Sequence, residues 1–320
     1  MPDDLLKSPF QSFDDMSFSD AHCFLCGQLL DDTKGREHVF PKWLLSRFNL
    51  WDQTILLLNR TRIPYRYLTI PCCATCNNEH LSQMEQAVEL SFREGPKHFR
   101  QLDKLLMYQW TGKIFYGLFH RELSLDLDRA SPELGSITTP ELMEDYRTLH
   151  GFLQSRRMPI KFEGFFPGSI FVFEVETIPN AGDFDYSDNF IGMTFCIRMG
   201  NIGVITCLKD DELILKGLTE LYQKLQGVRL HPMQFDELCA IVFYKAYSMA
   251  RSGKYVSITP PGEQSTVLKV PGFSLVPFFE DWDNEVYARF LEQFWSKWGI
   301  TYDQIFVPPD SIRTCLSDYL

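Results

Sequence analysis

The chain of 320 residues lacks the long apolar segments that mark membrane-spanning and secreted proteins. No apolar run approaches the ~18 residues that a membrane-spanning helix needs. The acidic start Met1-Pro2-Asp3-Asp4 is not followed by the apolar core of a secretory signal. We therefore expect a cytoplasmic protein without a membrane partner. No internal repeat is present either, so a repeat architecture is not expected.

Positive charge is also scarce, since 31 basic residues stand against 42 acidic ones and give a net charge of -11. This balance argues against a uniformly basic nucleic-acid-binding protein. The charge is unevenly spread, however: residues 21–113 hold 12 basic and 9 acidic residues, and the excess of acid lies in the rest of the chain. A polyanionic partner would therefore bind this segment.

Cysteine is well represented, and five of the nine cysteines gather in two places. Residues 23–26 read Cys-Phe-Leu-Cys and residues 73–76 read Cys-Ala-Thr-Cys, with 46 residues between them. Two such knuckles supply the four thiolates of a tetrahedral zinc site. Cys72 offers a second register with Cys76, although Cys73 matches the first knuckle better. A disulfide or a reactive pair is the alternative, which a reducing compartment disfavours.

The segment between the knuckles carries a second signal. Glu37-His38 is followed by Pro41, and Asn77 comes directly after the last cysteine. Together with the four knuckle cysteines, these residues resemble the HNH, or ββα-metal, nuclease family, and within it the subgroup that includes phage endonuclease VII. The resemblance covers about 60 of the 320 residues.

The resemblance implies a role for each matching residue. A structural zinc on Cys23, Cys26, Cys73 and Cys76 would pin a two-stranded hairpin to a helix. His38 would be the general base, while Glu37 and Asn77 would hold one catalytic divalent cation. His80 is three residues after Asn77 and would share its face of a regular helix, so it is a candidate further ligand.

The proposed chemistry is reasonable in its own terms. Phosphodiester hydrolysis needs a deprotonated water, and a histidine with an ordinary pKa of ~6.5 can accept that proton near neutral pH. Hard oxygen ligands suit Mg²⁺ or Mn²⁺, which relieve charge on the phosphate. Glu37 departs from the commoner Asp or His of the family. The middle Asn of the pattern has no assigned residue, since Asn49 and Asn59 both lie well before the second knuckle.

Four arginines are candidate phosphate contacts beside this site. Arg36 precedes the Glu-His pair, and Arg60, Arg62 and Arg66 alternate, so an extended strand would present the last three on one face, although Pro64 would bend it. A solvated edge is an equally good interpretation of the three.

The expected fold class is α+β, with an N-terminal zinc-stabilised ββα-metal module and a C-terminal α+β domain containing an antiparallel sheet. We predict a tail over 1–22, a nuclease domain with a helical extension over 23–125, a linker over 126–140 and a domain of unknown role over 141–320. Helices are expected over 41–48, over 81–120 with a break at Pro96, and over 141–157, 211–226, 233–251 and 284–298. Strands are expected near 170–175, 191–199 and 204–208, the last two as a hairpin. The aspartates at 183, 185 and 188 suggest a solvated loop.

Two function classes follow from these features. The first is a metal-dependent endonuclease with DNA as its partner, RNA being the weaker alternative; family-level analogy adds a bacterial restriction or anti-phage effector. The second is a catalytically inactive, zinc-stabilised module that binds nucleic acid or protein. The C-terminal domain is the expected surface for a homodimer or a protein partner.

Overall fold

The computed structural model describes residues 10, 21–31, 35–123, 140–179, 181–250, 253–258, 265–270 and 277–319. The chain forms two compact units, which are described separately. The first comprises residues 1–90, 105–164 and 255–269, and the second comprises 91–104, 165–254 and 270–320. This division differs from the expected one, since residues 140–164 belong to the first unit. Residues 126–139 of the expected linker 126–140, and most of the expected tail, lie outside the described residues, while Pro140 begins a helix.

The first unit is built on a short antiparallel ladder that is followed by helices. Strand β1 (Arg36–His38) pairs with β4 (Thr69–Pro71), and Glu37 stands opposite Ile70. Between them come α1 (Lys42–Arg47), the hairpin β2 (Thr54–Leu56) and β3 (Arg62–Pro64), and a 3₁₀ turn at Tyr65–Tyr67. Helix α1 begins after Pro41, as the sequence predicts, because proline is compatible with a helix start.

Helices follow the ladder in the order that the sequence predicts. The π-helical segment η2 (Cys76–Leu81) leads into α2 (Ser82–Glu94), Pro96 opens the short α3 (Pro96–Phe99), and α4 (Lys104–Glu122) follows. Helix α4 is buried on nearly all sides. Gly117 permits its close approach to the end of β1, because a Cβ there would lie 2.8 Å from Val39 Cγ2.

The first unit is completed by one more helix and a small sheet. Helix α5 (Pro140–Leu153) and its 3₁₀ extension (Gln154–Arg156) are followed by β5 (Ile160–Glu163). Strands β11 (Lys254–Ile258) and β12 (Ser265–Val270) join β5 in the order β11-β12-β5, and β12 runs parallel to β5. Tyr146 of α5 stacks on Phe115 of α4, with ring centroids 5.8 Å apart.

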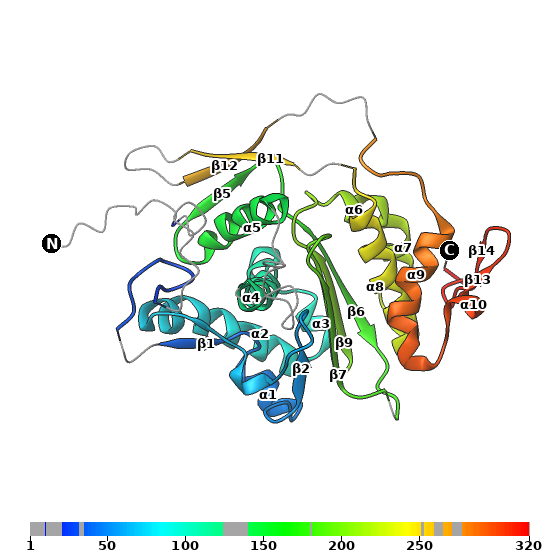
Figure 1. Cartoon of the computed structure of the whole chain (residues 1–320), viewed down its shortest axis with the longest axis horizontal. Helices are drawn as coiled ribbons and strands as arrows, with labels where there is room; N and C mark the ends of the chain where they lie inside the picture. Colours follow the sequence, from blue (N-terminus) through cyan, green and yellow to red (C-terminus); the bar gives the residue numbers. More distant parts are fainter. Residues whose placement is uncertain are drawn as a thin grey trace. The chain divides into compact units, whose positions relative to one another are not determined.

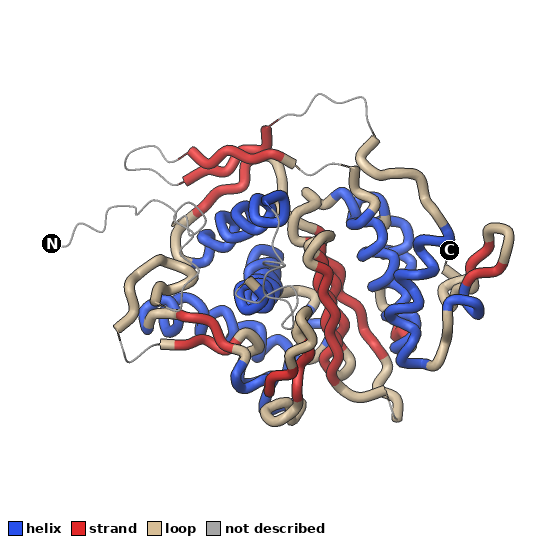
Figure 2. Tube along the Cα trace, viewed as in Figure 1, coloured by secondary structure: helices blue, strands red, loops and turns tan. Residues whose placement is uncertain are grey.

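The second unit contains a five-stranded sheet covered by helices on one face (Figures 1 and 2). The strand order is β10-β6-β9-β8-β7, and only the β10–β6 pair is parallel. The strands are β6 (Ser169–Val175), β7 (Phe184–Asn189), β8 (Thr194–Met199), β9 (Ile202–Cys207) and β10 (Arg229–Leu230). The expected hairpin joins β8 and β9 through Gly200, whose φ is +57°. The acidic stretch expected as a solvated loop instead forms β7.

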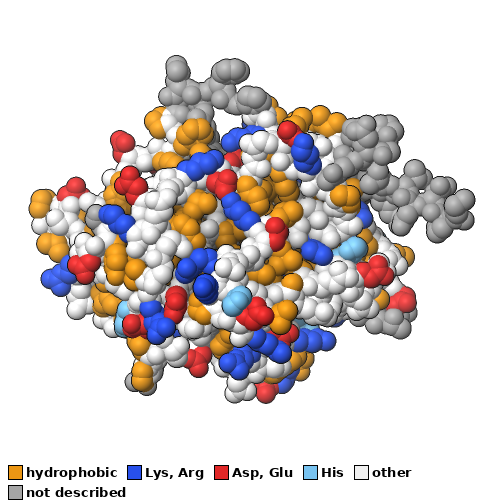
Figure 3. Space-filling view, turned by 180° about the vertical axis from the view of Figure 1, so that it is seen from behind, with side chains coloured by type: hydrophobic (Ala, Val, Ile, Leu, Met, Phe, Trp, Pro, Cys, Tyr) orange, Lys and Arg blue, Asp and Glu red, His pale blue; other side chains and the backbone are white. Residues whose placement is uncertain are grey.

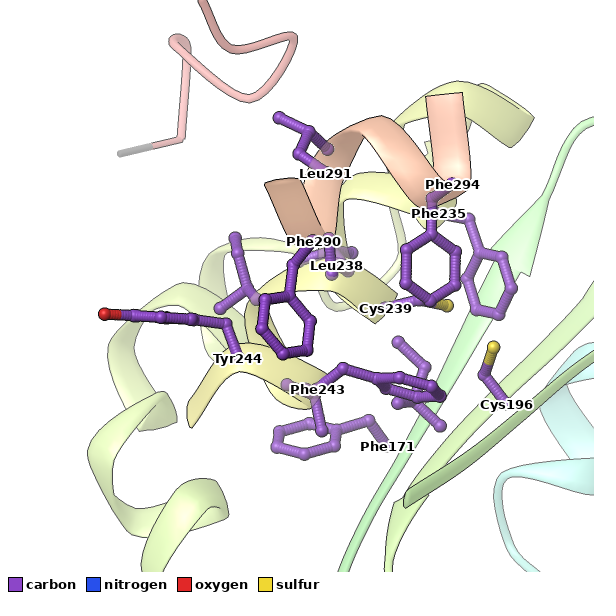
Figure 4. Packing of buried hydrophobic residues seen from close by; sticks show 14 of the residues in the cluster. Phe171, Cys196, Phe235, Leu238, Cys239, Phe243, Tyr244, Phe290, Leu291 and Phe294 are labelled. Atoms are coloured by element: carbon purple, nitrogen blue, oxygen red, sulfur yellow. The ribbon is translucent and has the colours of Figure 1, made fainter. Parts of the chain in front are cut away.

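Besides α3, the helices of this unit are α6 (Leu213–Gly217), α7 (Thr219–Lys224), α8 (Pro232–Tyr247), α9 (Asn284–Trp295) with a 3₁₀ turn at Ser296–Trp298, and α10 (Tyr302–Ile305). The pair β13 (Phe306–Val307) and β14 (Ser311–Ile312) follows. Figure 4 shows Phe235, Cys239 and Phe243 of α8 between the sheet and α9. Gly203 of β9 leaves room for the Phe235 ring, which would lie 2.4 Å from an added Cβ.

The protein is thus a mixed α+β fold whose strand pairs are mostly antiparallel, as expected. The two parallel pairs, β10–β6 and β12–β5, are exceptions to the predicted antiparallel sheet. None of the helices in the described ranges combines the length and the apolar character needed to cross a bilayer.

Candidate metal centre and its surroundings

The first knuckle is a tight turn that presents two sulfurs on the same side. Gly27 N donates to Cys23 O at 2.9 Å, and Cys23 N donates to Gln28 O at 2.9 Å. Gly27 has a φ of +74°, which disfavours any side chain, and its position would bring a Cβ to 2.4 Å from the Phe10 ring. The local sequence therefore folds the knuckle through backbone hydrogen bonds and one required glycine.

Helix α5 supports this knuckle from behind. The imidazole of His150 lies 2.8 Å from Phe24 O through Nε2, and Gln154 Nε2 donates to Leu25 O at 2.9 Å. Burial lowers the pKa of His150 to about 4, so the ring is neutral near pH 7. Because a carbonyl oxygen can only accept, His150 must carry its proton on Nε2.

The second knuckle lies where β4 passes into the helix. Asn77 N donates to Cys73 O at 3.0 Å, and Cys76 N donates to Cys73 Sγ at 3.4 Å. Phe24 N of the first knuckle donates to Pro71 O of β4 at 2.9 Å. The ladder, the helix start and the first knuckle therefore meet at one place.

The predicted quartet Cys23, Cys26, Cys73 and Cys76 is brought together there. All four Sγ atoms lie within 4.8 Å of one another, and Cys26 Sγ is 3.7 Å from Cys73 Sγ. Zinc–sulfur bonds of about 2.3 Å in a tetrahedron place sulfurs about 3.8 Å apart, so the geometry fits zinc. Cys72 is buried but is not one of the four, and its thiol faces Cys73 O at 3.6 Å. The structure thus groups Cys73, and not Cys72, with the other three cysteines.

The electrostatics of the cluster favour a cation. Hydrogen bonds from the thiols of Cys26, Cys72 and Cys76 hold the pKa of Cys23 far below its usual range. The Cys23 group in turn raises the pKa of Cys76. Four thiols this close cannot all ionise without a compensating positive charge, which a divalent ion supplies.

His38 follows on β1 and is half-buried. Its ring meets Trp51 edge to face, with centroids 5.6 Å apart. Its Nδ1 atom is buried and makes no hydrogen bond to any described residue. Burial and the nearby charge of Lys42 lower the pKa of His38, so the imidazole is neutral near pH 7. A neutral imidazole is the form that can accept a proton.

The Glu37 side chain lies on the opposite side of β1 from His38 and forms a buried ion pair there. Only 6% of Glu37 is exposed, and its carboxylate lies 2.6 Å from Lys113 Nζ of α4. Lys113 also reaches Glu85 Oε1 of α2 at 2.8 Å and donates to His38 O at 2.6 Å. Burial raises the pKa of Glu37, but the Lys113 charge outweighs it and the net shift is downward. Burial and Glu37 raise the pKa of Glu85 to about 7 despite Lys113.

The remaining candidates for the catalytic cation, Asn77 and His80, lie directly after the second knuckle. Asn77 and His80 are half-buried within η2, where π-helical winding no longer places residues three apart on one face. Burial and the charge of Arg156 lower the pKa of His80. Among the histidine, cysteine, aspartate and glutamate side chains of the described ranges, the four cysteines form the only group of three or more that could hold a metal ion. Glu37 and His80 are not part of such a group.

The four candidate arginines are exposed but do not lie on one strand. Arg60 is in the turn between β2 and β3 with a φ of +64°, Arg62 begins β3, and Arg66 is in a 3₁₀ turn where it pairs with Asp52. Arg36 donates to Thr69 Oγ1 at 2.8 Å. Figure 3 shows one face of the molecule, on which basic and acidic side chains are interspersed.

The two asparagines considered for the middle of the HNH pattern support local turns. Asn59 Oδ1 accepts from Thr61 N at 3.1 Å, and Asn49 has a φ of +53°.

The residues that sequence reasoning missed are Lys113 and Glu85. The signal for Lys113 was available, because it is a lone charge in the apolar run of residues 105–119. A lysine in such a run requires a buried carboxylate partner.

Comparison with protein-family models, with curated proteins and with solved structures finds no significant match to this chain. The site is therefore defined by its own residues: a four-cysteine cluster, a half-buried histidine and a buried Glu-Lys-Glu group.

Proposed function

We propose that the protein is a metal-dependent endonuclease that hydrolyses phosphodiester bonds in DNA in the manner of HNH enzymes. The observation that carries the proposal is the position of the cysteine cluster, which ties the β1–β4 ladder to the helix that follows it. His38 comes from that ladder. A structural zinc at this point would fix the strand that carries the base.

His38 is the residue assigned to proton transfer. Its neutral imidazole has a buried Nδ1 without a hydrogen-bond partner among the described residues, and edge contact with Trp51 orients the ring. Lys113 donates to the backbone oxygen of His38 and thereby also restrains the strand. In this proposal His38 accepts a proton from the attacking water.

In the proposal Glu37 and Asn77, with His80 as a further candidate, would hold the catalytic cation, Mg²⁺ or Mn²⁺. Glu37 would have to give up its ion pair with Lys113 to do so. When bound, such a cation neutralises charge on the phosphate and the departing oxygen. DNA is the proposed substrate because the basic surplus lies in residues 21–113. A role as a restriction or anti-phage effector is proposed by analogy alone.

A plasmid-cleavage assay tests the proposal. Purified protein should convert supercoiled plasmid to nicked or linear forms in Mg²⁺ or Mn²⁺ and should fail in EDTA. His38→Ala should lower the rate by about 10²–10⁴, the usual cost of removing a general base. His98→Ala is the matched control, because His98 is an exposed histidine of α3. Unchanged cleavage by a folded His38→Ala protein would contradict the assignment.

Asn77→Ala separates the metal role from the base role. Excess Mg²⁺ or Mn²⁺ should recover part of the rate of Asn77→Ala, because a lost ligand weakens affinity for the ion. Excess metal should not rescue His38→Ala. If metal does restore His38→Ala to the parental rate, His38 is a ligand and the two roles are reversed.

A second function is favoured by the Glu37–Lys113 ion pair. With Glu37 engaged by Lys113, the fold is also compatible with a zinc-stabilised module that binds nucleic acid without cutting it. Fluorescence anisotropy with labelled duplex DNA and RNA distinguishes the cases. Tight binding without cleavage in any metal would favour the module, and preferential cleavage of RNA would make the enzyme a ribonuclease.

A further inference from the structure

The second unit contains a cavity that plays no part in the proposed nuclease site. Its volume is about 350 Å³, and its walls come from α7, α8, the start of α9 and β14. Leu218, Leu221, Ile241 and Ile312 make much of the wall apolar. This volume is at the lower end of the range for small-molecule sites, about 300–1,000 Å³.

Helix α8 lines one side of the cavity with three residues at a spacing of four. Glu237, Ile241 and Lys245 therefore lie on one face of the helix. The carboxylate of Glu237 is already satisfied, because it accepts hydrogen bonds from the Thr314 hydroxyl and from Cys315 N. Glu237 thus holds the segment after β14 in place.

Lys245 is different, because no carboxylate in the described part of the chain pairs with it. Its ammonium lies over the rings of Phe279 and Trp282, at 5.4 and 5.5 Å from their centroids. The side chain is half-buried, and this burial lowers its pKa. A cation held over aromatic rings at the edge of an apolar cavity is positioned to meet an anion.

Tyr287 of α9 supplies a second unsatisfied donor. Only 4% of the residue is exposed, and its buried hydroxyl has no hydrogen-bond partner within the described ranges. A buried hydroxyl without a partner costs free energy, and native structures seldom leave one unpaired. Burial raises the pKa of Tyr287 well above its usual value, so the group keeps its proton and can donate it.

An aromatic wall stands beside these donors. The Trp282 ring lies 4.8 Å from the Tyr287 ring and 4.5 Å from Tyr244, measured between centroids. Figure 4 shows Tyr244 beside Phe290 in the buried hydrophobic core of the second unit, and their ring centroids are 5.7 Å apart. Trp282 remains 44% exposed and so offers free ring surface.

We propose that this cavity binds a small aromatic molecule that carries one anionic group. The ring packs against Trp282 and the apolar wall, while the anion meets the Lys245 ammonium and the Tyr287 hydroxyl. This inference is independent of the proposed nuclease activity, because all the residues that carry it belong to the second unit.

A pair of dyes tests the charge and the ring separately. The probes are 8-anilinonaphthalene-1-sulfonate, an aromatic anion, and N-phenyl-1-naphthylamine, which has the same rings without the sulfonate. In fluorescence titrations of the full chain, the anionic dye should bind saturably at one site and more tightly than the neutral dye. A neutral dye that binds the parent equally well overturns the proposal.

Two variants locate the site. Lys245→Met should lower the affinity for the anionic dye by about tenfold or more, the loss expected for one charge-assisted hydrogen bond. It should leave the affinity for the neutral dye nearly unchanged. Tyr287→Phe keeps the ring and should weaken only the anionic dye. Lys216→Met, at an exposed lysine of α6 outside the cavity, is the matched control.

Thermal melting of each variant shows whether it is folded. If Lys245→Met proves unstable, Lys245→Arg provides the second test, because it keeps the charge and should retain binding of the anionic dye. The proposal fails if Lys245→Met weakens both dyes equally, or if Lys216→Met weakens the anionic dye as much as Lys245→Met does.

Discussion

Lys113 is the residue whose environment most constrains the candidate site. Its ammonium is 2% exposed and lies between the carboxylates of Glu37 and Glu85. It also reaches the backbone oxygen of His38. One buried cation therefore both neutralises the predicted metal ligand and restrains the strand that carries the predicted base.

Replacing Lys113 with Met should destabilise the protein strongly. Glu37 would then be buried without its cation, and Glu85, whose pKa is already about 7, would keep its proton beside it. Removing one partner of a buried ion pair costs about 3–5 kcal/mol. Urea unfolding at neutral pH measures the change. Lys104→Met is the control on the same helix, because its partly exposed ion pair with Glu212 should contribute less than about 1 kcal/mol. Equal effects of the two substitutions would contradict this account of Lys113.

The cysteine cluster predicts opposite outcomes for two adjacent residues. Cys73→Ser removes one of four metal ligands and should abolish stoichiometric zinc, with loss of much of the ~10–16 kcal/mol that such ions contribute to folding. Cys72→Ser should keep zinc, because Cys72 lies outside the quartet. Metal content by mass spectrometry decides between them. Zinc retained by Cys73→Ser and lost by Cys72→Ser would reverse the ligand assignment.

At the scale of elements, α6 illustrates how a short helix is held by side chains distant in sequence. Asp210 accepts hydrogen bonds from Ser169 N at 2.7 Å, from Ser169 Oγ at 2.6 Å and from Ile214 N at 2.9 Å. Ser169 Oγ in turn accepts from Leu215 N at 2.8 Å. Two backbone donors in the first turn of α6 are thereby satisfied from β6 and from the segment before the helix.

Asp210 should make stability depend on pH. Burial raises its pKa to about 6, despite the hydrogen bonds from Ser169 and Ile214. The unfolded value is ~3.9, so between these values the folded state keeps a proton that the unfolded state has released. Stability from this group is therefore greatest at low pH and falls as the pH rises through about 6.

Asp210→Asn tests this sign. The unfolding free energy of the parent minus that of the variant should fall by about 1–3 kcal/mol between pH 4 and pH 7. Both proteins share the same cysteine cluster, so acid loss of metal cancels in the difference. Asp281→Asn, at an exposed carboxylate, should show no such slope. A difference that rises with pH would contradict the assignment.

Several elements follow directly from local sequence, and others do not. Pro41 starts a helix where predicted, the helical run breaks before Pro96 as predicted, and the Gly200 turn joins β8 to β9. Strand β7 was missed because its aspartates suggest solvent, although cross-strand pairing with β8 holds it in the sheet. The π-helical winding of η2 was also not predictable, because residue spacing alone assumes a regular helix.

At the scale of the whole molecule, the distribution of charge predicts how DNA binding responds to salt. Binding should weaken steeply as salt rises, with a slope near ~0.9 per phosphate contact on duplex DNA. Charge reversal at Arg60 and Arg62 should weaken binding to all sequences alike. Reversal at Arg66 should cost less, because Asp52 already pairs with it. Arg229→Glu, in the second unit, is the control, and an equal loss there would contradict an interface on residues 21–113.

The sequence by itself determined the metal quartet, because paired Cys-x-x-Cys spacing brings two sulfurs to one side of each turn whatever surrounds them. It also determined the α+β class and most helices, since proline, glycine and apolar periodicity act locally. Tertiary structure alone decided that Glu37 is buried in an ion pair. Its partners Lys113 and Glu85 are 76 and 48 positions away in the chain and meet it only on folding. It also decided which residues line the cavity of the second unit. Segments distant in sequence form that cavity. No local pattern records that, among the described residues, Lys245 has no carboxylate partner and the Tyr287 hydroxyl has no hydrogen-bond partner.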